Sequence, residues 1–297
     1  MAPSDVTVVV VTWNALPWLE QCLESVRGRE TIVVDHGSTD GTLELLREHW
    51  PDVRLIEQEN RGMGGGNNTG MRAADGRYFF LLNSDAWVLD DPLVDDGLDK
   101  LVEFADHHPE AAVIGPKLVN PDGTLQRSAR GEPTLWRLAT EYLFIRKLAP
   151  RSRRLNPLYR GDFAHDRAEE VDWLYGPALL VRREAADAVG LFDEDFFMFS
   201  EEVDWMTRFR RAGWSVLFFP GTQVVHVGGA SHGGNLYVEN LRGHLRWFDK
   251  HRGPKEAERV RKLLLWSLRL RALVLRKEQY REGARFLASG NARALLK

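Results

Sequence analysis

Three consecutive polar residues, Asn83, Ser84 and Asp85, have the chemistry to hold a metal ion and a diphosphate. They follow residues 78–82, the most hydrophobic run of the chain, which we predict to be a buried strand. Mg²⁺ prefers one or two carboxylates together with phosphate oxygens, so Asp85 could bind such an ion. His226 also ends a predicted strand and runs into a glycine-rich stretch, which leaves room for a ligand. A plain turn and a structural histidine are the alternatives.

Six carboxylates alternate with aromatic and aliphatic residues between 192 and 204. Glu201 and Glu202 begin a predicted helix, where the helix dipole favours negative charge and a carboxylate beside a pocket can act as a general base. Helix capping and an ion pair to a downstream arginine are the structural alternative.

Two glycine-containing segments could bind a nucleotide. Asp35 directly follows a predicted strand, and its carboxylate could accept two hydrogen bonds from a base or a ribose. Ser38 has a structural alternative as a helix cap. Residues 60–70 contain five glycines, which expose backbone amides and let a flat ligand approach closely. Their spacing matches neither the dinucleotide-binding motif nor a Walker A loop.

Strands must position these clusters. Apolar or β-branched runs at 6–12, 31–34, 53–57 and 78–82 alternate with helical patterns at 17–28 and 42–50, and a glycine-rich turn with a short helix precedes the last run. Such alternation predicts βαβ units and a doubly wound α/β sheet. Ligands of these sheets bind beyond the carboxyl ends of the strands, where all the polar clusters fall.

The rest of the chain is less regular. We predict helices at 92–108, 184–189 and 201–212, strand-like patterns at 173–182, 216–219 and 223–227, and an irregular insertion or lid at 120–172. Trp and Phe residues near 173–214 suit stacking on a sugar, although core packing explains them equally well.

Composition narrows the class of protein. The chain has 297 residues, 43% hydrophobic and 28% charged, as in ordinary globular proteins of one or two domains. The single cysteine, Cys22, excludes an intramolecular disulfide framework, and we expect a buried thiol. No signal peptide and no uncharged run of 18 residues is visible, which favours a cytoplasmic protein.

The charge is divided unevenly. Residues 250–297 carry 14 Lys and Arg against 4 Asp and Glu, whereas the preceding part is acidic and so disfavours nucleic-acid binding. We predict a helix over 256–285. It either packs its leucines on the body or on a second subunit of a homodimer, or lies as a basic amphipathic helix on an anionic membrane.

Taken together, these motifs resemble family 2 glycosyltransferases, and most closely the rhamnosyltransferase branch that builds bacterial surface glycans. The similarity covers about residues 5–235 and rests on the joint occurrence of segments 9–14, 34–42, 60–70, 82–85, 176–178, 182–183, 189–194, 201–205, 212–214 and 226–231. It implies a GT-A fold, with a nucleotide-sugar-binding half (1–119) and an acceptor and catalytic half (120–235). The basic helical tail (236–297), predicted from its charge and helical pattern, lies beyond the similarity.

The resemblance also implies residue roles. The expected nucleotide-sugar-binding residues are Thr12, Asn14, Asp35, Ser38, Gly62, Asn68, Asn83, Ser84 and Asp85. Asp85 and His226 are the expected ligands of a divalent cation, Mg²⁺ or Mn²⁺. The general base falls at Glu202, or at Glu201 beside it, because the family's usual Glu-Asp pair reads Glu-Glu here. The expected acceptor-binding residues are Trp173, Gly176 and Asp204.

The function implied is metal-dependent, inverting transfer of a sugar from a nucleotide-diphosphate sugar, such as dTDP-rhamnose or a UDP-sugar. The expected acceptor is a hydroxyl of a glycan or lipid-linked glycan in cell-surface polysaccharide synthesis. Such an acceptor would bring the chain to the inner face of the cell membrane as a peripheral protein. The alternative is a non-catalytic sugar-nucleotide-binding or partner subunit, against which the carboxylates of Asp85 and Glu202 weigh.

Overall fold

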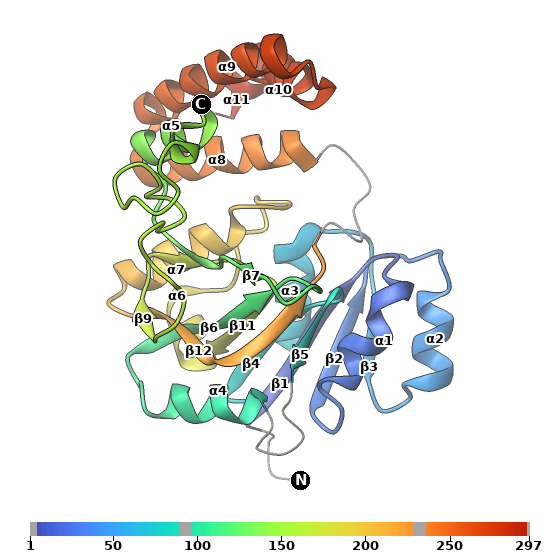
Figure 1. The fold of residues 1–297 in the computed structure, drawn as a ribbon. Helices are drawn as coiled ribbons and strands as arrows, with labels where there is room; N and C mark the ends of the chain where they lie inside the picture. The colour runs from blue at the N-terminus through green and yellow to red at the C-terminus, as the bar shows by residue number, and fades with distance from the viewer. Residues whose placement is uncertain (1–4, 90–96, 229–235, 296–297) are drawn as a thin grey trace.

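The computed structural model describes residues 5–89, 97–228 and 236–295, and its centre is one mixed β-sheet (Figure 1). Along the main path of the sheet the strand order is β3-β2-β1-β4-β11-β6-β12-β5. These strands are β1 (Val6–Thr12), β2 (Glu30–Asp35), β3 (Arg54–Glu57), β4 (Tyr78–Asn83), β5 (Ala86–Leu89), β6 (Ala111–Val119), β11 (Ala178–Arg182) and β12 (Ser215–His226).

The amino-terminal half forms the βαβ units that the sequence predicts. Strand β1 pairs in parallel with β2 and β4, and all seven of its residues are buried, as its apolar and β-branched composition requires. Helices α1 (Leu16–Glu24), α2 (Thr42–His49) and α3 (Gly62–Ala73) connect these strands. The carboxyl ends of β1, β2 and β4 therefore meet at one edge of the sheet.

The glycine-rich segment is more helical than the expected turn and short helix. Most of it is helix α3, which packs on β1 and β2. A Cβ added at Gly70 would lie 2.3 Å from Val9 Cγ1, and one at Gly66 would lie 2.7 Å from Val11 Cγ1. The glycines thus let this helix approach the strand closely, in addition to any role toward a ligand.

The second half of the chain extends the same sheet, so the sheet is mixed rather than wholly parallel. Strand β11 is antiparallel to both β4 and β6, and β12 is parallel to β6 and antiparallel to β5. Strand β6 was not predicted. The two strands expected at 216–219 and 223–227 form the single strand β12, with an irregularity between Phe219 and Gln223.

Shorter elements surround this sheet. They are α4 (Gly97–Asp106), β7 (Leu125–Gln126), β8 (Ala129–Arg130), α5 (Leu135–Tyr142), the 3₁₀ helix η1 (Ile145–Lys147), β9 (Glu169–Glu170), β10 (Trp173–Leu174), α6 (Arg183–Val189) and α7 (Glu201–Arg211). The region predicted as irregular therefore contains short strands and α5. Cys22 is buried, as predicted.

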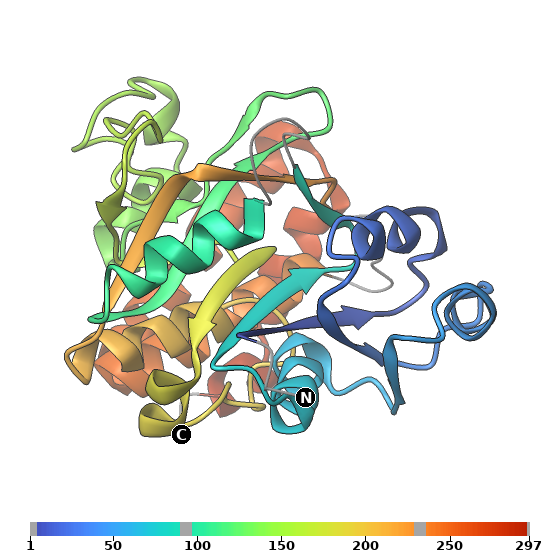
Figure 2. The same ribbon diagram turned by 90° about the horizontal axis from the view of Figure 1, so that it is seen from below.

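Four helices form a further layer, α8 (Leu236–Arg252), α9 (Pro254–Leu275), α10 (Glu278–Ala288) and α11 (Gly290–Ala294). Seen from below, they lie behind the sheet, on the side opposite α4 (Figure 2). The helix predicted over 256–285 is interrupted, because Arg276 adopts a left-handed conformation with φ 51° and α10 packs back against α9. Val260, Leu264 and Leu268 are fully buried in a third hydrophobic cluster that includes residues of α5 and α8.

Candidate functional site

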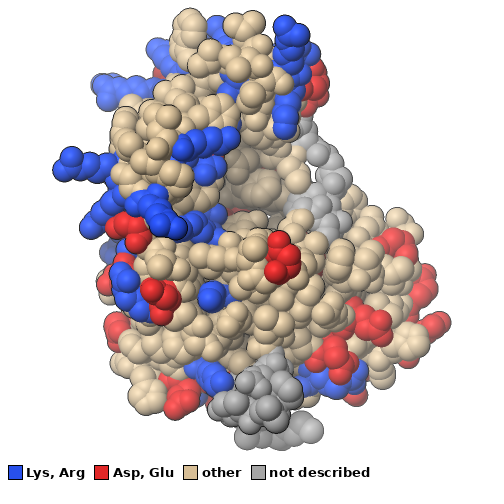
Figure 3. All heavy atoms as spheres, viewed as in Figure 1, with Lys and Arg blue, Asp and Glu red and all other residues tan. Residues whose placement is uncertain are grey.

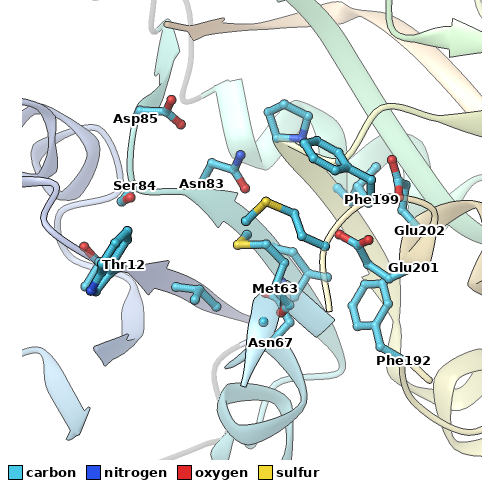
Figure 4. A pocket seen from close by; sticks show the side chains of 18 of the residues that line it. Thr12, Met63, Asn67, Asn83, Ser84, Asp85, Phe192, Phe199, Glu201 and Glu202 are labelled. Carbon is cyan, nitrogen blue, oxygen red and sulfur yellow. Dashed lines mark hydrogen bonds between the residues drawn. The ribbon is translucent and has the colours of Figure 1, made fainter. Parts of the chain in front are cut away.

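A cavity lies at the carboxyl ends of β1 and β4, where the sequence predicts a ligand site. Its walls come from these strand ends, from the start of α3, and from segments around 175–179 and 192–202. In Figure 4, Asp85 and Ser84 lie on one side of this first cavity, and Glu201 and Glu202 lie on the other. Asn83 and Met63 lie between the two groups.

Asp85 and His226 meet at one end of the first cavity. Strand β5 pairs with the end of β12 and brings His226 Nε2 within 3.4 Å of Asp85 Oδ1, with both side chains buried. The Gly228 amide donates to Asp85 Oδ2 at 3.2 Å. Burial alone would raise the pKa of Asp85, but its hydrogen bond and charge interaction with His226 lower the pKa below its usual value.

These two side chains fit a divalent cation in part. The other ring nitrogen of His226, Nδ1, lies 2.8 Å from Gln126 Oε1, so Gln126 can hold the imidazole with Nε2 directed at Asp85. No cluster of three or more His, Cys, Asp or Glu suited to a metal occurs in the described residues. A cation held by Asp85 and His226 would therefore need oxygen ligands from a bound diphosphate and from water, which suits Mn²⁺ or Mg²⁺.

Glu201 and Glu202 begin α7 and are both held in a dry environment. The Oε2 atom of each is buried and has no hydrogen-bond partner among the described residues. Burial raises the pKa of Glu202 to about 7. Burial and then the charge of Glu202 raise the pKa of Glu201 well above its ordinary value. Glu202, with its pKa close to neutrality, can therefore accept a proton near neutral pH.

Five further predicted residues line the first cavity: Thr12, Gly62, Asn83, Ser84 and Gly176. The Thr12 hydroxyl is buried without a hydrogen-bond partner in the described part of the chain, so it is free for a ligand. Gly62 has φ 75°, and a Cβ there would lie 1.9 Å from the Phe197 carbonyl oxygen. Glycine is therefore required where α3 begins.

Four predicted nucleotide-binding residues do not line this cavity. Asp35 accepts hydrogen bonds from the Gly37 and Ser38 amides and from the Ser38 hydroxyl. Ser38 Oγ also accepts a hydrogen bond from the backbone N–H of Asn14, and Asn14 Oδ1 accepts one from the backbone N–H of Thr39. These bonds fix the loops after β1 and β2.

Asn68 is likewise engaged elsewhere. Its side chain bonds the backbone nitrogen and oxygen of Phe192 and the Glu194 carboxylate. It thereby joins α3 to the segment that leads to Glu201.

A second cavity of about 580 Å³ adjoins the first. It lies between the segments carrying Arg130 and Trp173 and helices α5, α8 and α9. Tyr175, Phe199 and Glu202 line both cavities, and Glu201 lines only the first. Figure 3 shows a hollow between the helical layer and the body of the molecule. Among the predicted acceptor residues, Trp173 lines the second cavity and Gly176 the first.

Asp204 lines neither cavity, which differs from its expected acceptor role. It is fully buried, and its carboxylate pairs with Arg208 Nε at 2.9 Å, Lys250 Nζ at 2.8 Å and His251 Nε2 at 2.7 Å. Burial would raise the pKa of Asp204, but these partners lower it to about 2. The residue joins α7 to α8.

Several residues of the site escaped the sequence analysis. His36, Asn67 and Tyr175 line the first cavity, and Gln126 supports His226. The helical spacing of α3 could have indicated Asn67, because it and Asn68 point in different directions. Nothing local marks Tyr175 or Gln126, which reach the site through the fold of distant segments.

Comparison with known proteins agrees with this geometry. The sequence model of the family described as "Glycosyl transferase family 2" matches residues 7–190. The chain is 32% identical over 304 aligned positions to an N-acetylglucosaminyl-diphospho-decaprenol L-rhamnosyltransferase of Mycobacterium tuberculosis, covering 94% of this chain and 95% of that protein. The chain belongs to glycosyl transferase family 2.

Solved structures show that this glycosyltransferase has the GT-A fold, as predicted. A mannosyltransferase from Pyrobaculum calidifontis in complex with GDP-Man and Mn²⁺ superposes with TM-score 0.54 at 18% identity, covering 99% of this chain and 88% of that one. GalNAc-T7 with UDP, GalNAc and Mn²⁺ gives TM-score 0.58 at 16% identity, covering 88% and 51%. Glu201, Glu202 and His226 lie beyond the residues that the family model matches.

Proposed function

We propose that this glycosyltransferase moves a sugar, with inversion of the anomeric carbon, from a nucleotide-diphosphate sugar to a hydroxyl of a lipid-linked glycan. The similarity to the mycobacterial enzyme over nearly the whole of both chains supports an acceptor of this class in cell-surface polysaccharide synthesis. It also favours dTDP-rhamnose as donor, with a UDP-sugar as the second choice.

The observation that carries the proposal is the position of Glu202 at the junction of two cavities. The donor would bind in the first cavity with its diphosphate toward Asp85, and the acceptor would enter from the second. A carboxylate between them, with a pKa near 7, can take the proton of an acceptor hydroxyl as that oxygen attacks the sugar. Such a displacement needs no covalent nucleophile.

Charge develops on the departing diphosphate at the opposite side of the first cavity. Asp85 and His226 would hold a divalent cation there, which when bound would offset this charge. Ser84 lies at the same end and Asn83 lies nearer the middle of the cavity, and both can donate hydrogen bonds to phosphate oxygens. Thr12 has a free hydroxyl for the donor.

We also propose that the carboxyl-terminal helices hold the enzyme on an anionic membrane. No helix in the described residues is both long and apolar enough to cross a bilayer. Trp266, Leu270, Leu273 and Val274 share one face of α9 and are 55–76% exposed. Lys and Arg side chains gather around this helical layer, whereas acidic ones dominate near α1 and α2 (Figure 3). Peripheral contact would bring the second cavity to a lipid-linked acceptor.

Thermal-shift measurements with UDP-, dTDP- and GDP-sugars, each with and without Mn²⁺, test the donor and the metal. We expect one class of nucleotide sugar to raise the melting temperature, and the rise to depend on Mn²⁺. Asp85→Ala should keep the unliganded fold but lose the Mn²⁺-dependent rise. Equal stabilisation of the wild type with and without Mn²⁺ would contradict the metal site.

A further inference from the structure

The second cavity is lined by a half-buried arginine, Arg130, that forms no ion pair with a described carboxylate. The pairing of β8 with β10 sets Arg130 beside Trp173. The Nε atom of Arg130 is buried and has no hydrogen-bond partner, and none of the described carboxylates forms an ion pair with its guanidinium. The guanidinium lies instead over two aromatic rings. Its Cζ atom is 3.9 Å from the centroid of the Tyr159 ring and 5.9 Å from the centroid of the Trp173 ring.

This arrangement is costly in the absence of an anion. Burial lowers the pKa of the Arg130 guanidinium, which reflects the poor solvation of its charge. Aromatic faces stabilise a cation only in part. A buried donor of a charged group is normally paired, so the unpaired Nε of Arg130 indicates a missing anionic ligand.

Arg271 adds a second positive charge to the lining. It is 7% exposed, and it donates to the backbone oxygens of Tyr142 and Glu141 at 2.7 Å each. No ion pair to a carboxylate is formed by Arg271 within the described ranges. Arg271 and Arg130 both line the second cavity, although they lie far apart in the sequence.

The other ionisable groups of this lining do not cancel the two arginines. Glu141 forms its ion pair with Arg146. Burial lowers the pKa of His244 to about 4, so that ring is neutral. Glu202 is the remaining carboxylate, and it is only partly ionised at neutral pH. The cavity is therefore positive, and its 580 Å³ lies within the usual range for small-molecule sites.

We infer that the second cavity binds the phosphate groups of the acceptor, with Arg130 as the direct contact and Arg271 as a second source of charge. The ligand class is a sugar diphosphate carried on a lipid. Binding of the phosphates would hold the sugar between them and Glu202, with a hydroxyl toward the base. The inference rests on the proposed function, because it assumes that the acceptor enters this cavity.

Calorimetric binding to the full chain tests the inference, with the donor site saturated by nucleoside diphosphate and Mn²⁺. The probes are undecyl N-acetylglucosaminyl diphosphate and undecyl N-acetylglucosaminide, which differ only in the diphosphate. We expect the wild type to prefer the diphosphate probe. Arg130→Gln should weaken the affinity for the diphosphate probe about ten- to a hundredfold, the amount expected for the loss of hydrogen bonds to a charged group. The affinity for the neutral probe should not change.

Arg127→Gln is the matched control. Arg127 lies three residues earlier, donates to the carbonyl oxygens of Arg160 and Phe163, and lines neither cavity. Its loss should leave both affinities unchanged. Arg130→Lys, which keeps the charge, should retain part of the preference. If Arg130→Gln does not fold, salt dependence of the wild-type preference and competition by inorganic pyrophosphate decide the matter.

Equal affinity of the wild type for the two probes would overturn the inference. Equal weakening of both by Arg130→Gln would do the same, because it indicates a structural role. Inorganic pyrophosphate that binds as tightly as the full diphosphate probe would assign the site to a free anion rather than to the acceptor. If the protein transfers no sugar but still binds the diphosphate probe through Arg130, the proposed function would be wrong. The inference of an anion site at Arg130 would then still hold.

Discussion

At the start of α7 lie two adjacent glutamates whose Oε2 atoms are both buried without a hydrogen-bond partner among the described residues. Burial raises the pKa of both, and the charge of Glu202 raises that of Glu201 further. Because the two groups are adjacent, their titrations are coupled, so the negative charge belongs to the pair rather than to one residue. The amino-terminal end of a helix favours that charge. Glu202, which faces both cavities, is the member of the pair that can act as base.

This pair predicts the pH dependence of turnover. The base acts only when deprotonated, so kcat/KM should fall about tenfold per pH unit below an apparent pKa near 7. Initial rates measured from pH 5.5 to 9 test this expectation. Glu201→Gln should keep the same acidic limb, because burial is the main cause of the raised pKa of Glu202. A value of kcat/KM that stays constant down to pH 5.5, as expected for an ordinary exposed glutamate, would exclude Glu202 as the base.

Residue types at strand and helix ends were enough to find Asp85, His226 and the glutamate pair. They could not separate side chains that face the cavity from those that brace its loops. Asp35 and Asn68 have the donors and acceptors of ligand-binding residues, but neighbouring backbone groups occupy them. Asp204 lies on α7 two residues after Glu202, yet helical geometry directs it toward α8 instead.

Among the elements, α3 shows how composition can mislead. Five glycines in eleven residues favour a loop, because glycine destabilises a helix by about 1 kcal/mol. Here packing against β1 outweighs that propensity, since larger residues would separate the helix from the strand. The beginning of α3 in turn carries Gly62, Met63 and Asn67 to the first cavity.

Gly70→Ala should therefore destabilise the protein. The new methyl group would lie 2.3 Å from Val9 Cγ1, and overpacking of this kind costs roughly 1–3 kcal/mol. Gly290→Ala is the control, because nothing lies within 4 Å of its added Cβ and it is also helical. Urea denaturation should show a lower midpoint for Gly70→Ala alone. Equal midpoints for the two variants would show that the close approach of α3 carries no energetic weight.

Strand β6 is an element that the sequence analysis did not predict. It contains Gly115 and Pro116, which are unusual inside a central strand. Pro116 pairs with Phe219, at the irregularity of β12 that made this strand look like two. The pairing of β6 with β12 tolerates the proline because β12 is irregular at the same place. The two segments lie about a hundred residues apart, so neither reveals this by itself.

At the scale of the whole molecule, the carboxyl-terminal helices pack on the body, and they are also the surface that we propose meets the membrane. One face of α9 is fully buried, while the opposite face exposes Trp266 and Leu273 to solvent. Residues 250–297 are strongly basic and the remainder of the chain is acidic. This uneven distribution of charge would orient the molecule on an anionic surface, with the second cavity beneath the helical layer.

Vesicle co-sedimentation should detect this orientation. We expect the protein to bind vesicles containing phosphatidylglycerol but not pure phosphatidylcholine, and to be released by salt, because each Lys or Arg near such a surface adds about 1 kcal/mol. Leu273→Glu should weaken binding, whereas Leu16→Glu, at an exposed leucine of α1, should not. Binding that ignores lipid charge, or that both variants reduce equally, would contradict the proposed surface.

The most direct test of the account is the rate of sugar transfer by Glu202→Gln. Glutamine keeps the shape of the side chain but cannot accept the proton, so kcat should fall about 10²–10⁴-fold while donor binding is retained. The wild-type product should carry the inverted anomeric configuration. Near wild-type turnover by Glu202→Gln, or a product with retained configuration, would contradict the proposal that Glu202 is the base of a single displacement.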